Sequence, residues 1–303
     1  MKKICLLLLC TVPLILASCS SLMALADVGA QVAGATGAIS QDAANSISST
    51  SKSIASAAEV ITPEQEYYIG RAVAGTILER YKLYSNPGVE KYLNEICTTL
   101  AINSDRPEIY NGYHVAILDS DEINAFASSG GHILVTKGLL RCTDSEDAIA
   151  AVLAHELSHI HLQHGIKAIK SNRVTNALIA TGGTALVVAS DGSKEAVELV
   201  QAFDDSVKEV ITKMVDSGYS KQQEFEADKN ALKIMASAGY NPNAMQNMLS
   251  LLKANTKSGS GFGKTHPTPD ARIQNLAKEY SKYDVKDTMN SRNARFAIIK
   301  GIK

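Results

Sequence analysis

Residues 143–165 read TDSEDAIAAVLAHELSHIHLQHG, and this stretch decides how the rest of the chain folds. It starts with the pattern of a capping box from Thr143 to Glu146, and residues 148–164 then run without Gly or Pro. Gly165 is a typical residue for ending a helix. The sequence therefore predicts one uninterrupted helix that stops at Gly165.

This helix contains the string His155-Glu156-Leu157-Ser158-His159. Side chains four residues apart lie about 40° apart around a helix, so both imidazoles can bind one Zn²⁺. Glu156 would face the open position of that metal, where it could take a proton from a polarised water. The string predicts a hydrolytic zinc site.

Two further histidines follow in the same helix. His161 and His164 lie about 240° and 180° around the helix from His155, too far to reach the same metal. We interpret His161 as a flanking residue and His164 as a buried or helix-capping one. The apolar stripe between Ile149 and Ile160 lies on a neighbouring face, which predicts that the histidine pair sits beside the core and not inside it.

A zinc site of this type needs a third protein ligand, and residues 220–239 predict a second capped helix with acidic candidates. Glu224 and Asp228 share a face, whereas Glu226 lies about 200° away from Glu224. One carboxylate of such a pair would bind the metal, and the other would accept a hydrogen bond from a ligand histidine. The spacing alone does not assign the two roles.

Shorter elements surround these helices. The patterns predict helices over residues 62–83 and 87–102 and strands over residues 114–118 and 132–136. Residues 123–127 lie between the strands and are followed by Gly130 and Gly131, which favour a tight turn. We therefore expect a mainly helical α+β fold with one small antiparallel sheet.

The beginning of the chain is typical of an export signal. Lys2 and Lys3 precede an apolar run that closes on Leu-Ala-Ser-Cys19, which resembles a bacterial lipobox. We expect residues 1–18 to be removed and Cys19 to carry lipid; an ordinary signal peptide is the alternative. Ser20 resembles the sorting signal for the outer membrane, which predicts a lipid-anchored protein on its periplasmic side.

The mature chain would then have two parts. Residues 19–61 are rich in Ala, Ser and Gly and predict a tether, so residues 62–303 would form the folded domain. Residues 177–189 are apolar but too short to span a bilayer, and we interpret them as a buried or site-covering segment. Cys97 and Cys142 remain after lipidation, either as a disulfide or as two separate thiols.

Composition excludes one large class of partners. The 303 residues contain 30 Lys and Arg against 31 Asp and Glu, a net charge of -1, and no Trp. Such a chain lacks the basic surface and the stacking side chains with which proteins bind nucleic acid. We expect no nucleic-acid partner.

Three separated motifs, in this order, resemble metallopeptidase family forty-eight. They are residues 155–159, residues 224–228 and the segment Thr265-His266-Pro267-Thr-Pro-Asp-Ala-Arg272, and the likeness extends over about residues 62–280. Asn124 to Ala127, with the Gly-Gly-His that follows, is similar to the edge strand ahead of the family's zinc helix. The resemblance implies a zincin fold of the gluzincin type.

The resemblance also implies roles for individual residues. One Zn²⁺ per chain would be bound by His155, His159 and Glu224, with Glu156 as general base and acid. Asp228 would accept the hydrogen bond from a ligand histidine, His266 would approach the zinc or the oxyanion, and Arg272 would brace the site. The edge strand at Asn124, Ala125 and Phe126 would bind substrate.

The chain lacks the several transmembrane helices of the family's membrane-embedded members, so the resemblance favours the lipoprotein branch and excludes prenylated substrates. We expect a zinc-dependent endopeptidase of the cell envelope that cleaves unfolded or misassembled proteins, with outer-membrane assembly machinery as a further partner. One alternative is a chaperone-like assembly factor for outer-membrane proteins with a latent zinc site. A weaker one is a zinc hydrolase of a non-peptide amide.

Overall fold

The computed structural model describes residues 19–57, 61–169, 205, 207–256, 261–283 and 289–302. These residues form two compact units, an N-terminal one and a larger one that begins at Ile61. The predicted signal, the apolar segment 177–189 and residues 257–260 lie outside the described residues. Within the described part of the chain, no helix combines the length and the apolar character that crossing a membrane requires.

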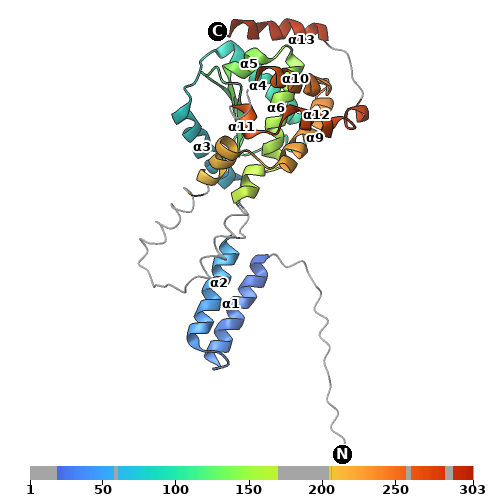
Figure 1. Cartoon of the computed structure of the whole chain (residues 1–303). Helices are drawn as coiled ribbons and strands as arrows, with labels where there is room; N and C mark the ends of the chain where they lie inside the picture. The colour runs from blue at the N-terminus through green and yellow to red at the C-terminus, as the bar shows by residue number, and fades with distance from the viewer. Residues whose placement is uncertain are drawn as a thin grey trace, which may run out of the picture. The chain divides into compact units, whose positions relative to one another are not determined.

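The described part of the N-terminal unit consists of two helices, α1 (Cys19–Ala35) and α2 (Gln41–Ala57), which pack against each other (Figure 1). Small side chains let them approach closely, since a Cβ added at Gly34 would lie 2.7 Å from the Cβ of Ala44. Ser48 is buried and donates a hydrogen bond to Asp27. The segment expected to be a tether therefore contains two helices, which its Ala content favours.

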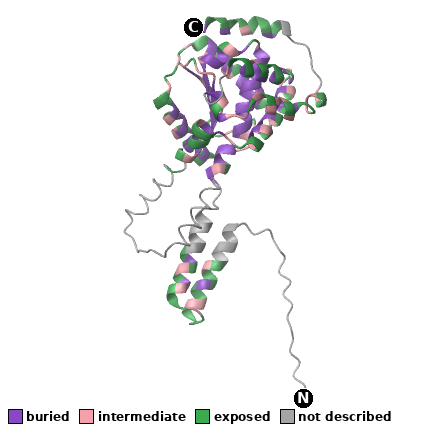
Figure 2. Cartoon of the chain, viewed as in Figure 1, coloured by how far each residue is buried: buried purple, intermediate pink, exposed green. Residues whose placement is uncertain are grey.

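The larger unit is built around α6 (Glu146–His161), whose residues are buried from Glu146 to Ile160 (Figure 2). The expectation that its histidines lie beside the core is wrong, because the helix is covered on every side. Small alanines such as Ala150 and Ala154 allow this close packing. The buried position removes water from the polar side chains that α6 carries.

Helices that precede and follow α6 in the sequence pack against it. Its neighbours are α4 (Pro87–Ile102), α9 (Lys221–Ser237), α10 (Ala244–Asn255) and α13 (Met289–Phe296) (Figure 1). Further helical elements among the described residues are α3 (Pro63–Arg80), α5 (Lys137–Cys142), η1 (Thr212–Ser217), α11 (Phe262–Thr265), α12 (Pro269–Leu276), η2 (Tyr280–Lys282) and η3 (Ala297–Gly301), and residues 164–169 and 207–211 are also helical. The mainly helical α+β class is thereby confirmed.

The sheet has three strands, β1 (His114–Leu118), β2 (Ala125–Ser128) and β3 (His132–Thr136), in the order β1-β3-β2. Gly130 and Gly131 have φ of 78° and 92° and form the predicted turn between β2 and the antiparallel β3. However, β1 runs parallel to β3, so the sheet is mixed and not purely antiparallel. The composition of a short strand does not encode its direction, and the link from β1 crosses β3 to reach the far edge.

Helix ends agree with the capping patterns in most places. Thr62 and Ser220 form complete capping boxes at the starts of α3 and α9, and α4 occupies the predicted residues 87–102. The capping box predicted at Thr143 is wrong, because Ser145 caps α6 and accepts a hydrogen bond from the Ala148 amide at 3.2 Å. Both cysteines of the domain are free thiols.

Candidate metal centre

Helix α6 supplies two histidines to the centre. His155 and His159 are one turn apart, and their Nε2 atoms lie 3.1 Å from each other. Both side chains are almost completely buried. Two imidazole nitrogens this close, on a helix held by its neighbours, form a preorganised half of a tetrahedral metal site.

Helix α9 supplies two carboxylates from the face that packs on α6. Glu224 places Oε2 3.5 Å from Nε2 of His155 and Oε1 3.5 Å from Nε2 of His159. Asp228 lies one turn further and places Oδ1 2.9 Å from Nδ1 of His155. Glu226 is on another side of the helix, and 46% of its side chain is exposed. The structure thus separates the two acids, one on each side of the His155 ring.

Arg272, from α12, lies behind this arrangement. Its Nε and Nη2 atoms contact the two carboxylate oxygens of Asp228 at 2.9 and 2.5 Å, and Nη2 lies 3.1 Å from Nδ1 of His155. The guanidinium is buried, so its charge offsets that of Asp228 in a dry environment. Arg272 therefore holds Asp228 in place beside His155.

His266 approaches from the opposite side, at the end of α11. Its Nδ1 lies 2.7 Å from Oε2 of Glu224, and its ring stacks on Phe262 with 3.9 Å between centroids. The segment is held by Gly218, whose φ is 72° and where a Cβ would lie 2.0 Å from the carbonyl oxygen of Thr265. Any larger residue at position 218 would displace the loop that carries His266.

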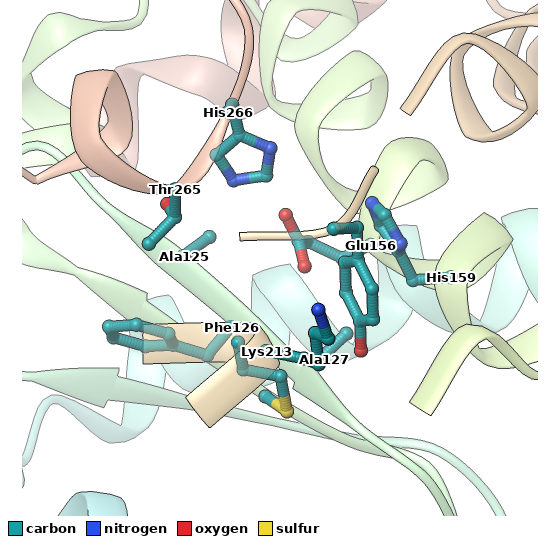
Figure 3. A pocket seen from close by; sticks show the side chains of 10 residues that line it. Ala125, Phe126, Ala127, Glu156, His159, Lys213, Thr265 and His266 are labelled. Carbon is teal, nitrogen blue, oxygen red and sulfur yellow. The ribbon is translucent and has the colours of Figure 1, made fainter. Parts of the chain in front are cut away.

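Glu156 is buried beside the histidines, and its Oε1 has no hydrogen-bond partner among the described residues. Figure 3 shows Glu156, His159 and His266 around one cavity, with residues 125–127 of β2 also in its lining. Burial raises the pKa of Glu156 above its usual range. A carboxylate in this setting can exchange a proton with a group that enters the cavity.

The donor set fits a divalent metal. His155, His159, Glu224 and His266 each offer one ligand atom, and all four atoms lie within 4.8 Å of one another. Oε1 of Glu224 is buried without a hydrogen-bond partner among the described residues, which is costly unless a ligand satisfies it. Two or three imidazole nitrogens with one carboxylate oxygen form a ligand set that suits zinc.

The charges around the centre also favour a cation. Burial opposes the charged form of His155, but hydrogen bonds to Asp228 and Glu224 outweigh it and raise its pKa to about 9. Burial holds the pKa of His159 well below its usual range, which keeps that ring neutral as metal binding requires. For Glu224, burial raises the carboxyl pKa, but the contacts with His266 and His155 outweigh it and hold the pKa well below its usual range.

Only part of the predicted substrate-binding segment lines the cavity. Ala125 and Phe126 line it, whereas Asn124 does not. Asn124 is buried, its backbone amide donates to Thr136 Oγ1 at 3.1 Å, and its side-chain Oδ1 accepts from the Ala125 amide at 3.0 Å. Asn124 therefore connects β2 to the end of β3.

Sequence reasoning missed two aromatic neighbours of His159. Tyr219 stacks on its ring with 4.5 Å between centroids, and His164 places Nδ1 2.9 Å from its Nδ1. Helical periodicity had put His164 on the opposite face. Helix α6 instead ends at His161, and Gln163, with φ of 53°, separates it from a second helical stretch over residues 164–169, so Gly165 does not end the helix as predicted. No residue pattern signals this break. Nε2 of His161 lies within hydrogen-bond distance of the Tyr113 hydroxyl, at 3.1 Å, and not at the metal centre.

The chain is similar in sequence to several curated proteins over much of its length. It is 26% identical over 247 residues to the beta-barrel assembly-enhancing protease of Yersinia pestis, covering 80% of this chain and 49% of the relative. The protein of the same name from Escherichia coli is 25% identical, covering 72% and 44%. Metalloprotease LoiP of Escherichia coli is 27% identical, covering 67% and 75%. The chain thus spans about half the length of the first two relatives.

The family model covers the part of the domain that holds every donor described above. Peptidase family M48 matches residues 87–280, from the start of α4 to the first residue of η2. The members of this family are metallopeptidases, which agrees with the cluster of histidines and glutamate on α6, α9 and α11. With well over half of its residues matched, the chain belongs to peptidase family M48.

Proposed function

We propose that this chain is a zinc-dependent endopeptidase, with one Zn²⁺ bound by His155, His159 and Glu224. The observation that carries the proposal is the unpartnered carboxylate of Glu156 beside these converging donor atoms. A merely structural metal site is closed by its ligands and needs no free base next to it. The names of the relatives, two proteases and a metalloprotease, support the same activity.

A bound zinc ion would polarise the scissile carbonyl and lower the pKa of water in the cavity. Glu156 would take the proton of the attacking water and pass it to the leaving amine, a role that its raised pKa suits. Asp228, held by two hydrogen bonds from Arg272, would accept the Nδ1 proton of His155 and so keep that ring in the orientation and protonation state that ligation requires. Each of these residues works at a fixed position in a buried site.

His266 would have a movable role. Its 2.7 Å contact with Glu224 places it where it can either join the ligands or steady an oxyanion. We propose that it closes the centre at rest and donates to the oxyanion when substrate is bound. α11 is a single turn whose Phe262 and Thr265 are buried, so the movement would involve the side chain of His266.

The substrate would bind along β2. Among the described residues this strand pairs with β3 alone, and Ala125, Phe126 and Ala127 line the cavity at Glu156. A peptide added as a further antiparallel strand would be held by backbone hydrogen bonds with little sequence selectivity. A bound peptide inhibitor that made no backbone contact with β2 would refute this binding mode.

The cellular setting is also part of the proposal. A lipid on Cys19 would hold the protein at the periplasmic side of the outer membrane, near newly exported chains. Unfolded or misfolded envelope proteins would be the substrates, and the name of the first relatives favours a link to beta-barrel assembly. Cys19→Ser should release the protein from the membrane fraction and remove the acyl mass from its N-terminal peptide.

The direct test is incubation of the zinc-loaded full chain with a chemically unfolded protein, and with the same protein folded. We expect new internal termini, read by mass spectrometry, from the unfolded form only, and none after chelation of the zinc. A chaperone without peptidase activity would suppress aggregation of the unfolded protein and produce no new termini. That second result would refute the proposed activity.

A further inference from the structure

His164 is fully buried beneath the metal centre, on the side of His159 that faces away from Glu224. Its Nδ1 lies 2.9 Å from Nδ1 of His159, while Nε2 of His159 is the atom aimed at Glu224. His164 is therefore not one of the metal donors. It occupies, for His159, the place that Asp228 occupies for His155.

Metal binding determines which of the two rings donates the hydrogen bond and which accepts it. A metal-binding Nε2 on His159 needs its lone pair, so the proton of that ring must be on Nδ1. Nδ1 of His159 then donates to Nδ1 of His164, whose own proton must be on Nε2. The carboxylate of Glu226 lies 3.8 Å from that Nε2, and its negative charge favours a proton at this position.

We propose that His164 is a positioning residue that fixes the orientation and the protonated nitrogen of His159 for metal binding. This inference rests on the proposed ligand set. His164 differs from Asp228 because it is neutral when it accepts the bond. A second buried carboxylate here would need a partner such as Arg272, and His164 fulfils the role without one.

The backbone supports a dedicated role for His164. Gln163 adopts a left-handed conformation with φ of 53°, which is strained for a non-glycine residue. Its side chain is anchored by a 3.3 Å hydrogen bond to the buried Glu66. Gly165 follows, where a Cβ would lie 3.2 Å from Ser129 Oγ and 3.4 Å from the Tyr219 hydroxyl. Backbone strain at Gln163 and close packing at Gly165 thus accompany the position of His164 beside His159.

The first experiment measures zinc affinity of the full chain by competition with a chelator. His164→Phe keeps a ring of similar size but removes the acceptor, so the dissociation constant should rise about 10- to 100-fold. His164→Gln, whose side-chain oxygen can accept from His159, should recover most of the affinity. His161→Phe is the matched control, because His161 contacts Tyr113 and not the centre, and should bind zinc like the parent. Parent-like affinity in folded His164→Phe would overturn the proposal.

The second experiment needs no variant, so it holds even if His164→Phe fails to fold. In the zinc-loaded parent labelled with ¹⁵N-histidine, nuclear magnetic resonance should show the proton of His159 on Nδ1 and that of His164 on Nε2. A proton on Nδ1 of His164 would overturn the inference. If the parent shows the expected protonation of both histidines but cleaves no protein, only the proposed peptidase activity is refuted. If the parent binds no zinc, the peptidase activity and the role of His164 are both refuted.

Discussion

The first turn of α6 and its later turns both bury charged side chains, but only one of the two sets is internally satisfied. Glu146 accepts hydrogen bonds from Arg295 at 2.6 and 2.9 Å, from Tyr92 at 3.1 Å and from Tyr240 at 3.3 Å. Asp147 beside it accepts from Arg292 at 2.8 Å. We call these residues the arginine cluster; its carboxylates have the partners that burial demands.

The metal centre, further along the same helix, is different. Glu156 and Glu224 each leave a buried oxygen without a hydrogen-bond partner among the described residues, and the histidine nitrogens converge on Glu224. No arginine or lysine of the described residues pairs with either oxygen. The comparison teaches that buried charge alone does not indicate a functional site. A functional site is indicated instead by buried side-chain oxygens and nitrogens that lie around one point and lack hydrogen-bond partners.

The largest effect should come from removing the carboxylate at the centre of that convergence. Glu224→Ala should lower zinc affinity by more than about 10²-fold and abolish cleavage, because two imidazoles alone hold the metal weakly. Glu226→Ala is the matched control on the same helix and should keep stoichiometric zinc, with only a small loss of affinity through His164. Metal content of the purified proteins, measured by mass spectrometry, decides the result. Full zinc in Glu224→Ala would remove Glu224 from the ligand set.

Glu156→Gln should separate metal binding from turnover. The amide keeps the shape of the side chain but cannot accept a proton, so cleavage should fall by about 10³- to 10⁴-fold while zinc stays bound. Cleavage rates and zinc content should be measured on the same preparation. A zinc-replete variant that cleaves near the parent rate would identify another residue as the base.

His266→Ala should have a smaller effect. Loss of the proposed oxyanion donor should lower turnover of unfolded substrates on the order of 10²-fold, and the uncovered centre should attack folded proteins less selectively. Rates on an unfolded protein and on its folded form provide the comparison. Unchanged rate and selectivity would mean that the histidine of α11 is a bystander.

The smallest effect on the centre should come from the arginine cluster. Glu146→Ala leaves the hydroxyls of Tyr92 and Tyr240 without their acceptor, so the free energy of unfolding should fall by about 2–4 kcal/mol. Zinc affinity and turnover at a temperature where the protein is folded should equal those of the parent. Denaturant unfolding and metal competition measure the two quantities. A large loss of zinc affinity would break the distinction between the two sets.

Much of the metal centre could be predicted because it is encoded locally. His155 and His159 share a face by helical geometry, and so do Glu224 and Asp228. The capping residue Ser220 and the turn at Gly130 and Gly131 are equally local signals. Such features need no knowledge of the partners that fold onto them.

The rest depends on contacts between distant residues. Arg292 reaches Asp147 across 145 residues, and no spacing rule connects the two. The parallel direction of β1 follows from a crossing connection, which the apolar pattern of a strand does not contain. Gln163 adopts its positive φ because surrounding structure holds it there, and so the position of His164 could not be predicted either.

The most direct test of this account is anomalous diffraction at the zinc absorption edge, from crystals of the zinc-loaded full chain. We predict one strong peak at about 2.0–2.2 Å from Nε2 of His155, from Nε2 of His159 and from a carboxylate oxygen of Glu224, with Glu156 close by but not bound. A peak elsewhere, or a metal bound through Glu156 with Glu224 turned away, would contradict the account.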